Sequence, residues 1–588
     1  MNETVKDVST AWTDVLEFVF VIALLSLWNA AAAEQHRHAD AHAVAKMNML
    51  KASLHAQGDI AVHGHERLRA LAHNAASHVN GFIPVTFIDT RPSMGGGSDR
   101  PPLNDAAEVG ALIRNQEFDK ALAVATRMTQ SSPGDPSGFN FQGAAYLGKK
   151  DTANARKSFE KALKLNPDDA IALTNLGQID ILQKDTVAAR KRFQAVLSKT
   201  PNDVPAMLGM AQLEILKGDS KAMFTWFEKA KAARPEAVDP RLNIAAYHMR
   251  RSNFKQAIQE LTEAKRVIPG NADIIDLLGQ AQLADGQSKS AIATFKDLVA
   301  ARPDAPLAYY RLATAQAGNN DFSGAAQSLK KALQIKPEFV SATVLLAELE
   351  TREKRYSEAL KLAKQLQSMQ EAAPIGLVLE GDILMAQQRY ADATKAYESA
   401  FAKNPTGPMM VKLHRAQTGS GKLTDADATL ERWLRNHPDD LAALQFAAAE
   451  NVRKGQNKLA IAQYEQIVRK DATNQLALNN LAGLYHQAGH PKALQTAEAA
   501  YKLNPESPVI ADTLGWLLIE QGNTTRGLQL LKSALARAPK NPEIRYHLAA
   551  AQAKTGDKIN ARKELEALLA SEQAFPDRAA AQALLKQL

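Results

Sequence analysis

A proline returns every 34 residues through the first half of this 588-residue chain. The seven positions that keep this step are Pro133, Pro167, Pro201, Pro235, Pro269, Pro303 and Pro337. A fixed period of this kind indicates one small unit repeated along the chain, because each unit must bury its apolar face against the next. Proline cannot continue an α-helix, so we expect each proline to end the second helix of a two-helix unit. Length alone would suggest roughly four globular domains, whereas the period predicts one array.

Small and bulky side chains keep the same period ahead of the prolines. Before Pro167 they are Ala155, twelve residues earlier, Phe159, eight earlier, and Ala162, five earlier. Alanine is expected where two helices cross too closely for a larger side chain, and phenylalanine fills the space that a small neighbour leaves. Gly143 in the preceding helix has the same close-approach role. The pattern therefore predicts interlocked pairs of antiparallel helices.

Spacing, small residues, aromatic residue and proline together resemble the tetratricopeptide repeat. Residues 136–169 and 170–203 carry the pattern most completely. The resemblance implies an all-α fold, an α-solenoid in which about 14 helix-turn-helix units form a right-handed superhelix. We assign residues 102–573 to this array. Residues 574–588 are expected to form a capping helix that covers the apolar face of the last unit.

The resemblance also implies a binding groove along the first helices of the units. In proteins of this family the second, fifth, ninth and twelfth residues of a unit face that groove. Carried over by phase, the candidate partner-binding residues are Gln178, Gln212, Asp276, Gln280, Tyr310, Asp512, Trp516, Glu543 and Tyr546. These residues match neither the Lys, Arg and Asn set that clamps a peptide carboxylate nor a ladder of asparagines for a peptide backbone.

Four of these residues form the most ligand-like feature of the sequence. Asp512, Trp516, Glu543 and Tyr546 combine aromatic rings with carboxylates, and such combinations stack on sugars or anchor peptides. The alternative interpretation is ordinary packing between neighbouring units. If the first interpretation holds, truncation of Trp516 weakens partner binding and changes stability little.

The N-terminal hundred residues lack the repeat. Within residues 1–34, the uncharged run 18–33 ends in small residues and indicates a hydrophobic export signal or membrane anchor. The alternative is a buried helix. Residues 35–101 are expected to form a histidine-rich polar segment, followed by a linker of Gly, Ser and Pro.

Eight of the fourteen histidines lie between His36 and His78. The spacing of His36, His38 and His42 suits a zinc, copper or nickel ion. No signature such as HExxH completes a site, so we favour a polar, partly helical stalk without a bound metal.

The sequence offers no recognisable catalytic chemistry. It contains no cysteine, which excludes disulfides, thiolate metal sites and cysteine nucleophiles. It also lacks glycine-rich phosphate-binding motifs, a GxSxG elbow and an EF-hand loop. The net charge of +8 comes from 71 basic and 63 acidic residues, a balance too diffuse to indicate nucleic acid. We predict a protein that is not an enzyme and that binds neither a cofactor nor nucleic acid.

Residues 500–569 resemble the end of the large tetratricopeptide proteins of the PEP-CTERM/exosortase and exopolysaccharide systems of Gram-negative bacteria. The phrases DTLGW at 512–516 and PEIRYHLA at 542–549 carry the similarity. It implies a non-enzymatic scaffold of the cell envelope for exopolysaccharide production or export, or for PEP-CTERM protein sorting. Implied partners are envelope or secretion assembly proteins, polysaccharide, and the membrane through the N-terminal segment. The protein would be periplasmic or anchored in the inner membrane facing the periplasm; the alternative is a cytoplasmic adaptor for a soluble complex.

Overall fold

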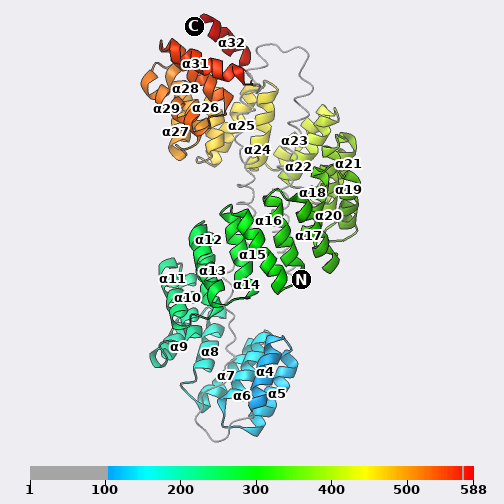
Figure 1. Ribbon diagram of the computed structural model, residues 1–588, viewed down its shortest axis with the longest axis vertical. Coiled ribbons are helices and arrows are strands. Elements are labelled where there is room, and N and C mark those ends of the chain that lie inside the picture. The colour runs from blue at the N-terminus through cyan, green and yellow to red at the C-terminus, as the bar shows by residue number, and fades with distance from the viewer. Residues whose placement is uncertain (1–102, 572–574, 576) are drawn as a thin grey trace. The chain divides into compact units, whose positions relative to one another are not determined.

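The computed structural model describes residues 103–571, 575 and 577–588, and Figure 1 shows them as a succession of helices. All regular secondary structure in these residues is α-helical. Internal contacts divide them at Lys336 into two compact units. We call residues 103–336 the N-terminal unit and residues 337–588 the C-terminal unit.

The N-terminal unit consists of seven helix pairs. Its helices are α4 (Leu103–Arg114), α5 (Phe118–Ser131), α6 (Pro136–Gly148), α7 (Thr152–Leu165), α8 (Ala170–Leu182), α9 (Thr186–Lys199), α10 (Val204–Lys217), α11 (Ser220–Ala233), α12 (Val238–Arg250), α13 (Phe254–Val267), α14 (Ala272–Ala284), α15 (Ser288–Ala301), α16 (Pro306–Gly318) and α17 (Phe322–Ile335).

The C-terminal unit consists of seven further pairs and one additional helix. Its helices are α18 (Val340–Arg352), α19 (Tyr356–Gln367), α20 (Ala373–Ala386), α21 (Tyr390–Lys403), α22 (Gly407–Gly419), α23 (Leu423–Asn436), α24 (Leu441–Arg453), α25 (Asn457–Lys470), α26 (Gln475–Gln487), α27 (Ala493–Leu503), α28 (Pro508–Glu520), α29 (Thr524–Arg537), α30 (Pro542–Lys554), α31 (Lys558–Ala570) and α32 (Arg578–Gln587). The predicted all-α solenoid of about fourteen two-helix units is therefore confirmed.

Helix α7 shows how the sequence sets the helix ends. The Asp151 carboxylate accepts a hydrogen bond from the Asn154 N–H (3.1 Å) and so satisfies a donor of the first turn. The last turn closes with a bond from the Asn166 N–H to the Ala162 carbonyl (2.9 Å), and Pro167 follows. Every second helix from α5 to α17 likewise ends two residues before its repeating proline. The predicted stopping role of these prolines is thus confirmed.

Glycines of the first helices and rings of the second helices set how closely each pair packs. A Cβ atom at Gly143 would lie 2.6 Å from the Phe159 ring, and a Cβ atom at Gly177 would lie 2.6 Å from the Phe193 ring. The rings therefore occupy the space that a side chain would need. Ala162 is fully buried in the same core as Phe159. The predicted interlocking of small and bulky residues is confirmed.

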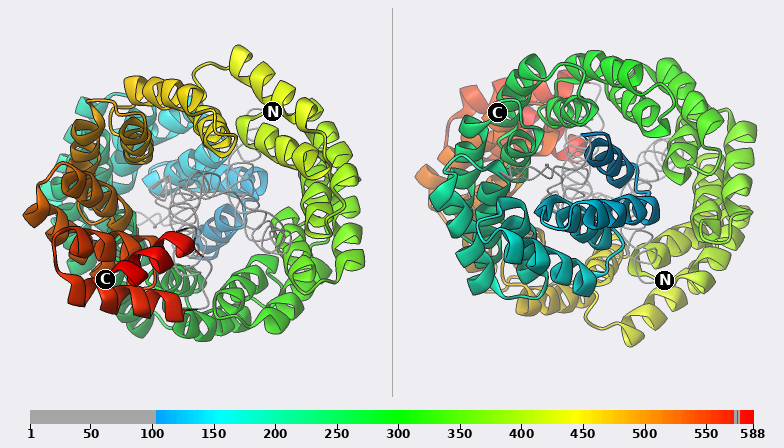
Figure 2. Two further views of the ribbon diagram at one scale, coloured as in Figure 1. Left: turned by 90° about the horizontal axis from the view of Figure 1, so that it is seen from above. Right: turned by 90° about the horizontal axis from the view of Figure 1, so that it is seen from below.

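Consecutive first helices lie closer together than consecutive second helices. Helix α8 contacts α10 in the N-terminal unit, and α28 contacts α30 in the C-terminal unit. No two consecutive second helices in the described part of the chain contact each other to that extent. Each unit therefore curves with its first helices on the inner side, and Figure 2 shows the helices of each unit following a curve.

Helix α32 packs on the last helix pair. Ala581 is fully buried together with Leu565 and Leu568 of α31 and Ala549 of α30. This apolar contact shields part of the end of the array from water, which is the role of a terminal helix in repeat proteins. The predicted segments 1–34 and 35–101, the latter with His36, His38 and His42, lie outside the described residues.

Candidate functional site

One residue of each first helix, 33 or 34 positions after the last, marks what we call the inner face. In the N-terminal unit these residues are Ala144, Gln178, Gln212, Ala246, Gln280 and Thr314. In the C-terminal unit they are Glu348, Asp382, Arg415, Ala449, Gly483, Trp516 and Ala550. The inner face is thus uncharged at these positions in the N-terminal unit, and charged and then aromatic in the C-terminal unit.

Helix α8 shows why this side is the inner one. Ile179 packs against α7, and Gly177 packs against the Phe193 ring of α9. Thr174, Gln178 and Ile181 follow at steps of four and three, so they share the opposite side of the helix. That side points away from both neighbouring second helices, as the sequence phase predicts.

Three polar atoms at this place have no hydrogen-bond partner among the described residues: Thr174 Oγ1, Gln178 Nε2 and Gln212 Oε1. Thr174 and Gln178 are 1% and 6% exposed. A buried polar atom without a partner costs about 1–3 kcal/mol, so few remain in folded proteins. The sequence selects both glutamines, but it carries no signal for their unsatisfied state.

The predicted residues of α14 and α16 are tied to neighbouring helices or buried. The Asp276 carboxylate accepts a hydrogen bond from the Arg311 guanidinium across 3.0 Å, which forms an ion pair between the two helices. Gln280 is buried. Tyr310 is half-buried, and its carbonyl accepts a hydrogen bond from the Thr314 hydroxyl. This part of the inner face supports contacts between repeats.

Near the end of the C-terminal unit, the structure joins two of the predicted residues through a third. The His547 imidazole of α30 lies 2.8 Å from the Asp512 carboxylate of α28. The Trp516 ring stacks on the same imidazole, with ring centres 5.0 Å apart. Tyr546 lies at the edge of this group, its ring centre 6.1 Å from that of His547. Glu543 is half-buried in the first turn of α30.

Sequence reasoning missed His547, although its position 35 residues after Asp512 carries the necessary signal. Burial lowers the pKa of the imidazole, but the Asp512 carboxylate and the more distant Glu543 and Asp577 outweigh it, so the pKa lies above its ordinary value. The second carboxylate oxygen of Asp512 is buried without a hydrogen-bond partner in the described residues. The group therefore combines an aromatic surface with a paired acid and base.

A cavity of about 510 Å³ lies between α30 and α32. It is lined by Tyr546, Ala550, Ala553, Lys554, Ala580, Ala583, Leu584, Gln587 and Leu588. Tyr546 thus links the aromatic group to the cavity. The small alanines on both helices leave the space that the cavity occupies.

A buried charged group crosses the inner face farther toward the N-terminus of the same unit. Lys412 Nζ of α22 lies 2.6 Å from the Asp382 carboxylate of α20, which also accepts a hydrogen bond from the Tyr397 hydroxyl across 2.5 Å. Burial raises the pKa of Asp382 and lowers that of Lys412, while their contact opposes both shifts. The group joins three helices and binds its own charges, so it serves the array.

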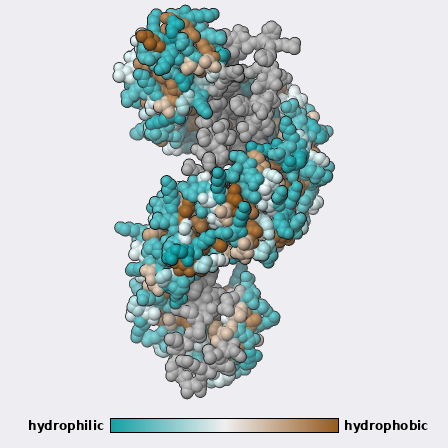
Figure 3. Space-filling model, viewed as in Figure 1, coloured by the Kyte–Doolittle hydropathy of each residue, from teal (hydrophilic) through white to brown (hydrophobic). Residues whose placement is uncertain are grey.

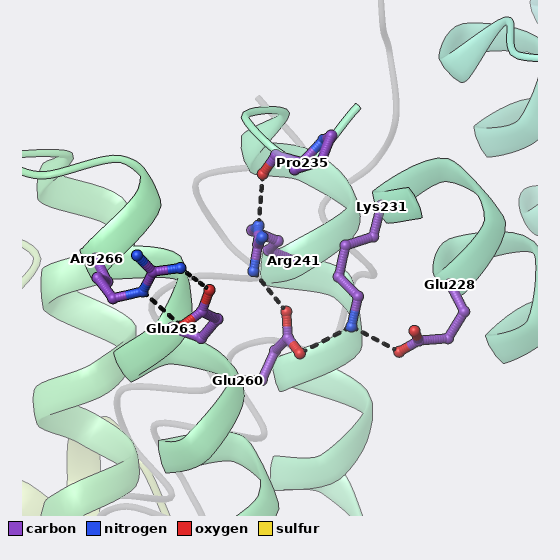
Figure 4. A network of polar contacts seen from close by, with 7 residues as sticks. All are labelled: Glu228, Lys231, Pro235, Arg241, Glu260, Glu263 and Arg266. Atoms are coloured by element: carbon purple, nitrogen blue, oxygen red, sulfur yellow. Dashed lines mark hydrogen bonds and ion pairs between the residues drawn. The ribbon is translucent and has the colours of Figure 1, made fainter. Parts of the chain in front are cut away.

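Other charge networks hold successive helices together. In Figure 4, Lys231 lies between the carboxylates of Glu228 and Glu260, at 3.0 Å from each. Arg241 also binds Glu260, at 3.2 Å, and donates to the Pro235 carbonyl. This network ties α11, α12 and α13 together. It stabilises the spacing of the first helices and adds no reactive group to the inner face.

Within the residues that the structure describes, no three His, Cys, Asp or Glu side chains come together as metal ligands. The described helices include none with both the length and the apolar character that a bilayer crossing requires. The visible surface in Figure 3 is mostly hydrophilic, with separate hydrophobic patches.

Known proteins resemble this chain in repeat sequence. Models described as tetratricopeptide repeat match residues 146–213, 447–508 and 518–588, and a tetratricopeptide repeat-like domain matches residues 276–416. Cellulose synthase operon protein C of Komagataeibacter sucrofermentans is 30% identical over 126 residues, which are 20% of this chain and 9% of that protein. A TPR repeat-containing protein of Pseudomonas aeruginosa is 28% identical over 123 residues, 20% of each chain. The chain thus spans a fifth or less of the length of these relatives.

Solved structures show the same kind of fold. The crystal structure of yeast Tom70 aligns with a TM-score of 0.38 and 17% identity, covering 78% of this chain and 98% of that chain. YrrB, described as a TPR protein with an unusual peptide-binding site, aligns with a TM-score of 0.27 and 21% identity, covering 32% of this chain and 96% of that chain.

Proposed function

Because the chain belongs to the tetratricopeptide repeat proteins, we propose that it is a non-enzymatic scaffold of the bacterial cell envelope that gathers other proteins along its inner face. Repeat arrays of this kind present extended concave surfaces for protein and peptide binding. The observation that carries the proposal is the uncommitted chemistry of the inner face. Gln178 and Gln212 hold polar atoms without partners in the described residues, and Trp516 stacks on His547 at the other end.

The process we propose is the production or export of an exopolysaccharide. The relatives named cellulose synthase operon protein C support this assignment through a shared stretch of repeats. The DTLGW and PEIRYHLA phrases support it through their resemblance to repeat proteins of exopolysaccharide and PEP-CTERM systems. The partners would then be proteins of a synthesis, export or sorting assembly, with polysaccharide as a further ligand.

We place the repeat array in the periplasm, either exported or held at the inner membrane by residues 18–33. The length and apolar character of that run support this placement. The alternative is a cytoplasmic adaptor for a soluble complex, since the same array would serve there. A fusion of alkaline phosphatase to the C-terminus separates the two: an active phosphatase is expected, and an inactive but stable fusion would contradict the envelope placement.

Crosslinking in the native host, followed by affinity purification and mass spectrometry, tests the scaffold itself. We expect the full chain to recover envelope proteins of polysaccharide synthesis or export. A variant with Gln178→Leu, Gln212→Leu and Trp516→Ala should recover fewer of them, whereas the exposed outer-side control Gln194→Leu should match the wild type. Equal recovery by the first variant and the wild type would exclude the inner face as the binding surface.

A further inference from the structure

The proposed function leaves open what the inner face recognises in a partner, and the inference here rests on that function. We propose that the inner face of α8 and α10 binds an extended, uncharged segment of a partner protein through that segment's main chain. The side-chain amides of Gln178 and Gln212 pair with its peptide groups. The side chains of the segment contact the aliphatic residues between and beside the two amides.

The unsatisfied atoms are the first reason. Gln178 Nε2 is a buried donor and Gln212 Oε1 a buried acceptor, and Thr174 Oγ1 lies one turn from Gln178 on the same side of α8. None of the three has a hydrogen-bond partner within the described residues. Each side-chain amide carries both a donor and an acceptor, as a peptide group does. A bound main chain would therefore satisfy both amides whichever way each one turns.

Glutamines elsewhere in the N-terminal unit show that the unsatisfied state is local. Gln282 of α14 accepts a hydrogen bond from the Thr294 hydroxyl across 2.8 Å, and Gln316 of α16 accepts one from the Ser328 hydroxyl across 2.7 Å. Both of these glutamines face a second helix that carries a matching hydroxyl. The array thus provides partners for buried amides where they face its own helices, and leaves Gln178 and Gln212 without them at the inner face.

The surroundings favour uncharged partner side chains. Ile181 and Leu208 lie on the same sides of their helices as the two glutamines and are buried, while Leu182 and Leu216, the next positions around, are 57% and 58% exposed. The carboxylates of these helices are already paired. Asp180 binds Arg156 and Arg192, and Glu214 binds Arg190. A charged ligand would therefore lose water here without gaining a partner.

The same residues favour a polypeptide over a sugar chain. Sugars are bound by stacking on aromatic rings, and neither α8 nor α10 contains a Phe, Tyr or Trp residue. Aliphatic side chains next to amides suit a chain that alternates apolar groups with peptide bonds. Polysaccharide recognition, if it occurs on this protein, finds better chemistry at Trp516.

Helix spacing sets the register of the bound segment. Packed helices are about 8–10 Å apart, and three residues of extended chain span about 10 Å. Gln178 and Gln212 occupy equivalent positions on adjacent first helices. The two amides should therefore meet peptide groups three residues apart in the partner.

Isothermal titration of the full chain with a capped peptide of about ten residues, built from Val, Ser and Thr, tests the proposal. We expect the wild type to bind it, and Gln178→Leu and Gln212→Leu each to weaken binding about five- to tenfold. Gln194→Leu, an exposed glutamine on α9, should leave binding unchanged. Methylating single backbone nitrogens of the peptide should weaken binding at two positions three residues apart and matter less at the positions between them.

Thermal unfolding of the same variants shows whether the amides serve the fold instead. Because neither atom has a partner in the free chain, Gln178→Leu and Gln212→Leu should keep or raise Tm. A fall in Tm with binding retained would overturn the proposal, and so would failure of the wild type to bind the peptide. Binding of cellohexaose that is lost in both leucine variants would replace the peptide with a sugar. Partners recovered from the host in spite of any of these results would leave the scaffold function standing.

Discussion

Nδ1 of His547 and Oδ2 of Asp512 lie 2.8 Å apart and join α30 to α28, and the same relationship joins Arg311 of α16 to Asp276 of α14 at 3.0 Å. In both pairs the acid precedes the base by 35 residues, so the fifth residue of one first helix meets the sixth residue of the next. The arrangement thus recurs in the two units. The arginine is charged at every accessible pH, whereas the histidine titrates near neutrality.

Raising the pH should loosen the contact between α28 and α30. The folded pKa of His547 lies above the ordinary value of about 6.5, because Asp512, with Glu543 and Asp577, outweighs the effect of burial. The pair's stabilisation is therefore fully present below about pH 6.5 and is lost as the pH rises through the folded pKa. Hydrogen exchange of α30, corrected for intrinsic rates, should speed up between these limits. His547→Gln should abolish that response, and exchange of α16 should not show it.

Trp516→Ala should weaken partner binding and lower stability little. The ring is half-buried and stacks on His547, and aromatic pairs of this kind contribute about 0.5–1.5 kcal/mol. Pull-down of crosslinked partners and urea unfolding of the same protein measure the two effects separately. A large loss of stability with partner binding retained would show that Trp516 belongs to the packing between repeats.

Ala162→Phe should destabilise the array by about 1–3 kcal/mol through overpacking. Ala162 is fully buried between Phe159 and the residues of α8, so a ring at this position must displace its neighbours. Ala195→Phe, at an exposed position of α9, provides the matched control and should be nearly neutral. Chemical denaturation monitored by circular dichroism gives both values, and equal values would contradict the packing described for α7.

Breaking the buried pair between Lys412 and Asp382 should be costly, whereas replacing the whole group should not. Lys412→Ala leaves the Asp382 carboxylate buried without its cation, for which we expect a loss of about 3–5 kcal/mol. A triple variant with Lys412→Met, Asp382→Leu and Tyr397→Phe removes all the polar partners together and should stay close to wild-type stability. Denaturation midpoints compare the variants. A large loss in the triple variant would show that the pair itself stabilises the fold.

The repeat and its helix ends could be predicted from the sequence because they depend on local rules. Pro167 ends α7 through its missing N–H and its ring, whatever surrounds it. Gly143 and Phe159 lie 16 residues apart within one helix pair, so the same spacing in each unit shows that they meet. Both features follow from the 34-residue period and needed no information from distant parts of the chain.

The inner face was only partly predictable. Phase alone selected Gln178, Gln212 and Trp516, and the structure places all three on first helices at the expected step. Phase did not distinguish Asp276, which is paired with Arg311, from Gln212, whose carbonyl oxygen has no partner in the described residues. Their roles in partner binding stay predictions.

The sequence by itself determined that this chain builds two-helix units, where each helix ends, and which residues interlock within a pair, because those contacts repeat with the period. Only the tertiary structure decided that Asp512 meets His547, that Lys412 meets Asp382, and that the amides of Gln178 and Gln212 lack complete partners. These relationships join different units. They depend on the curvature of the array and on side chains that change from one unit to the next, and neither is encoded in the period itself.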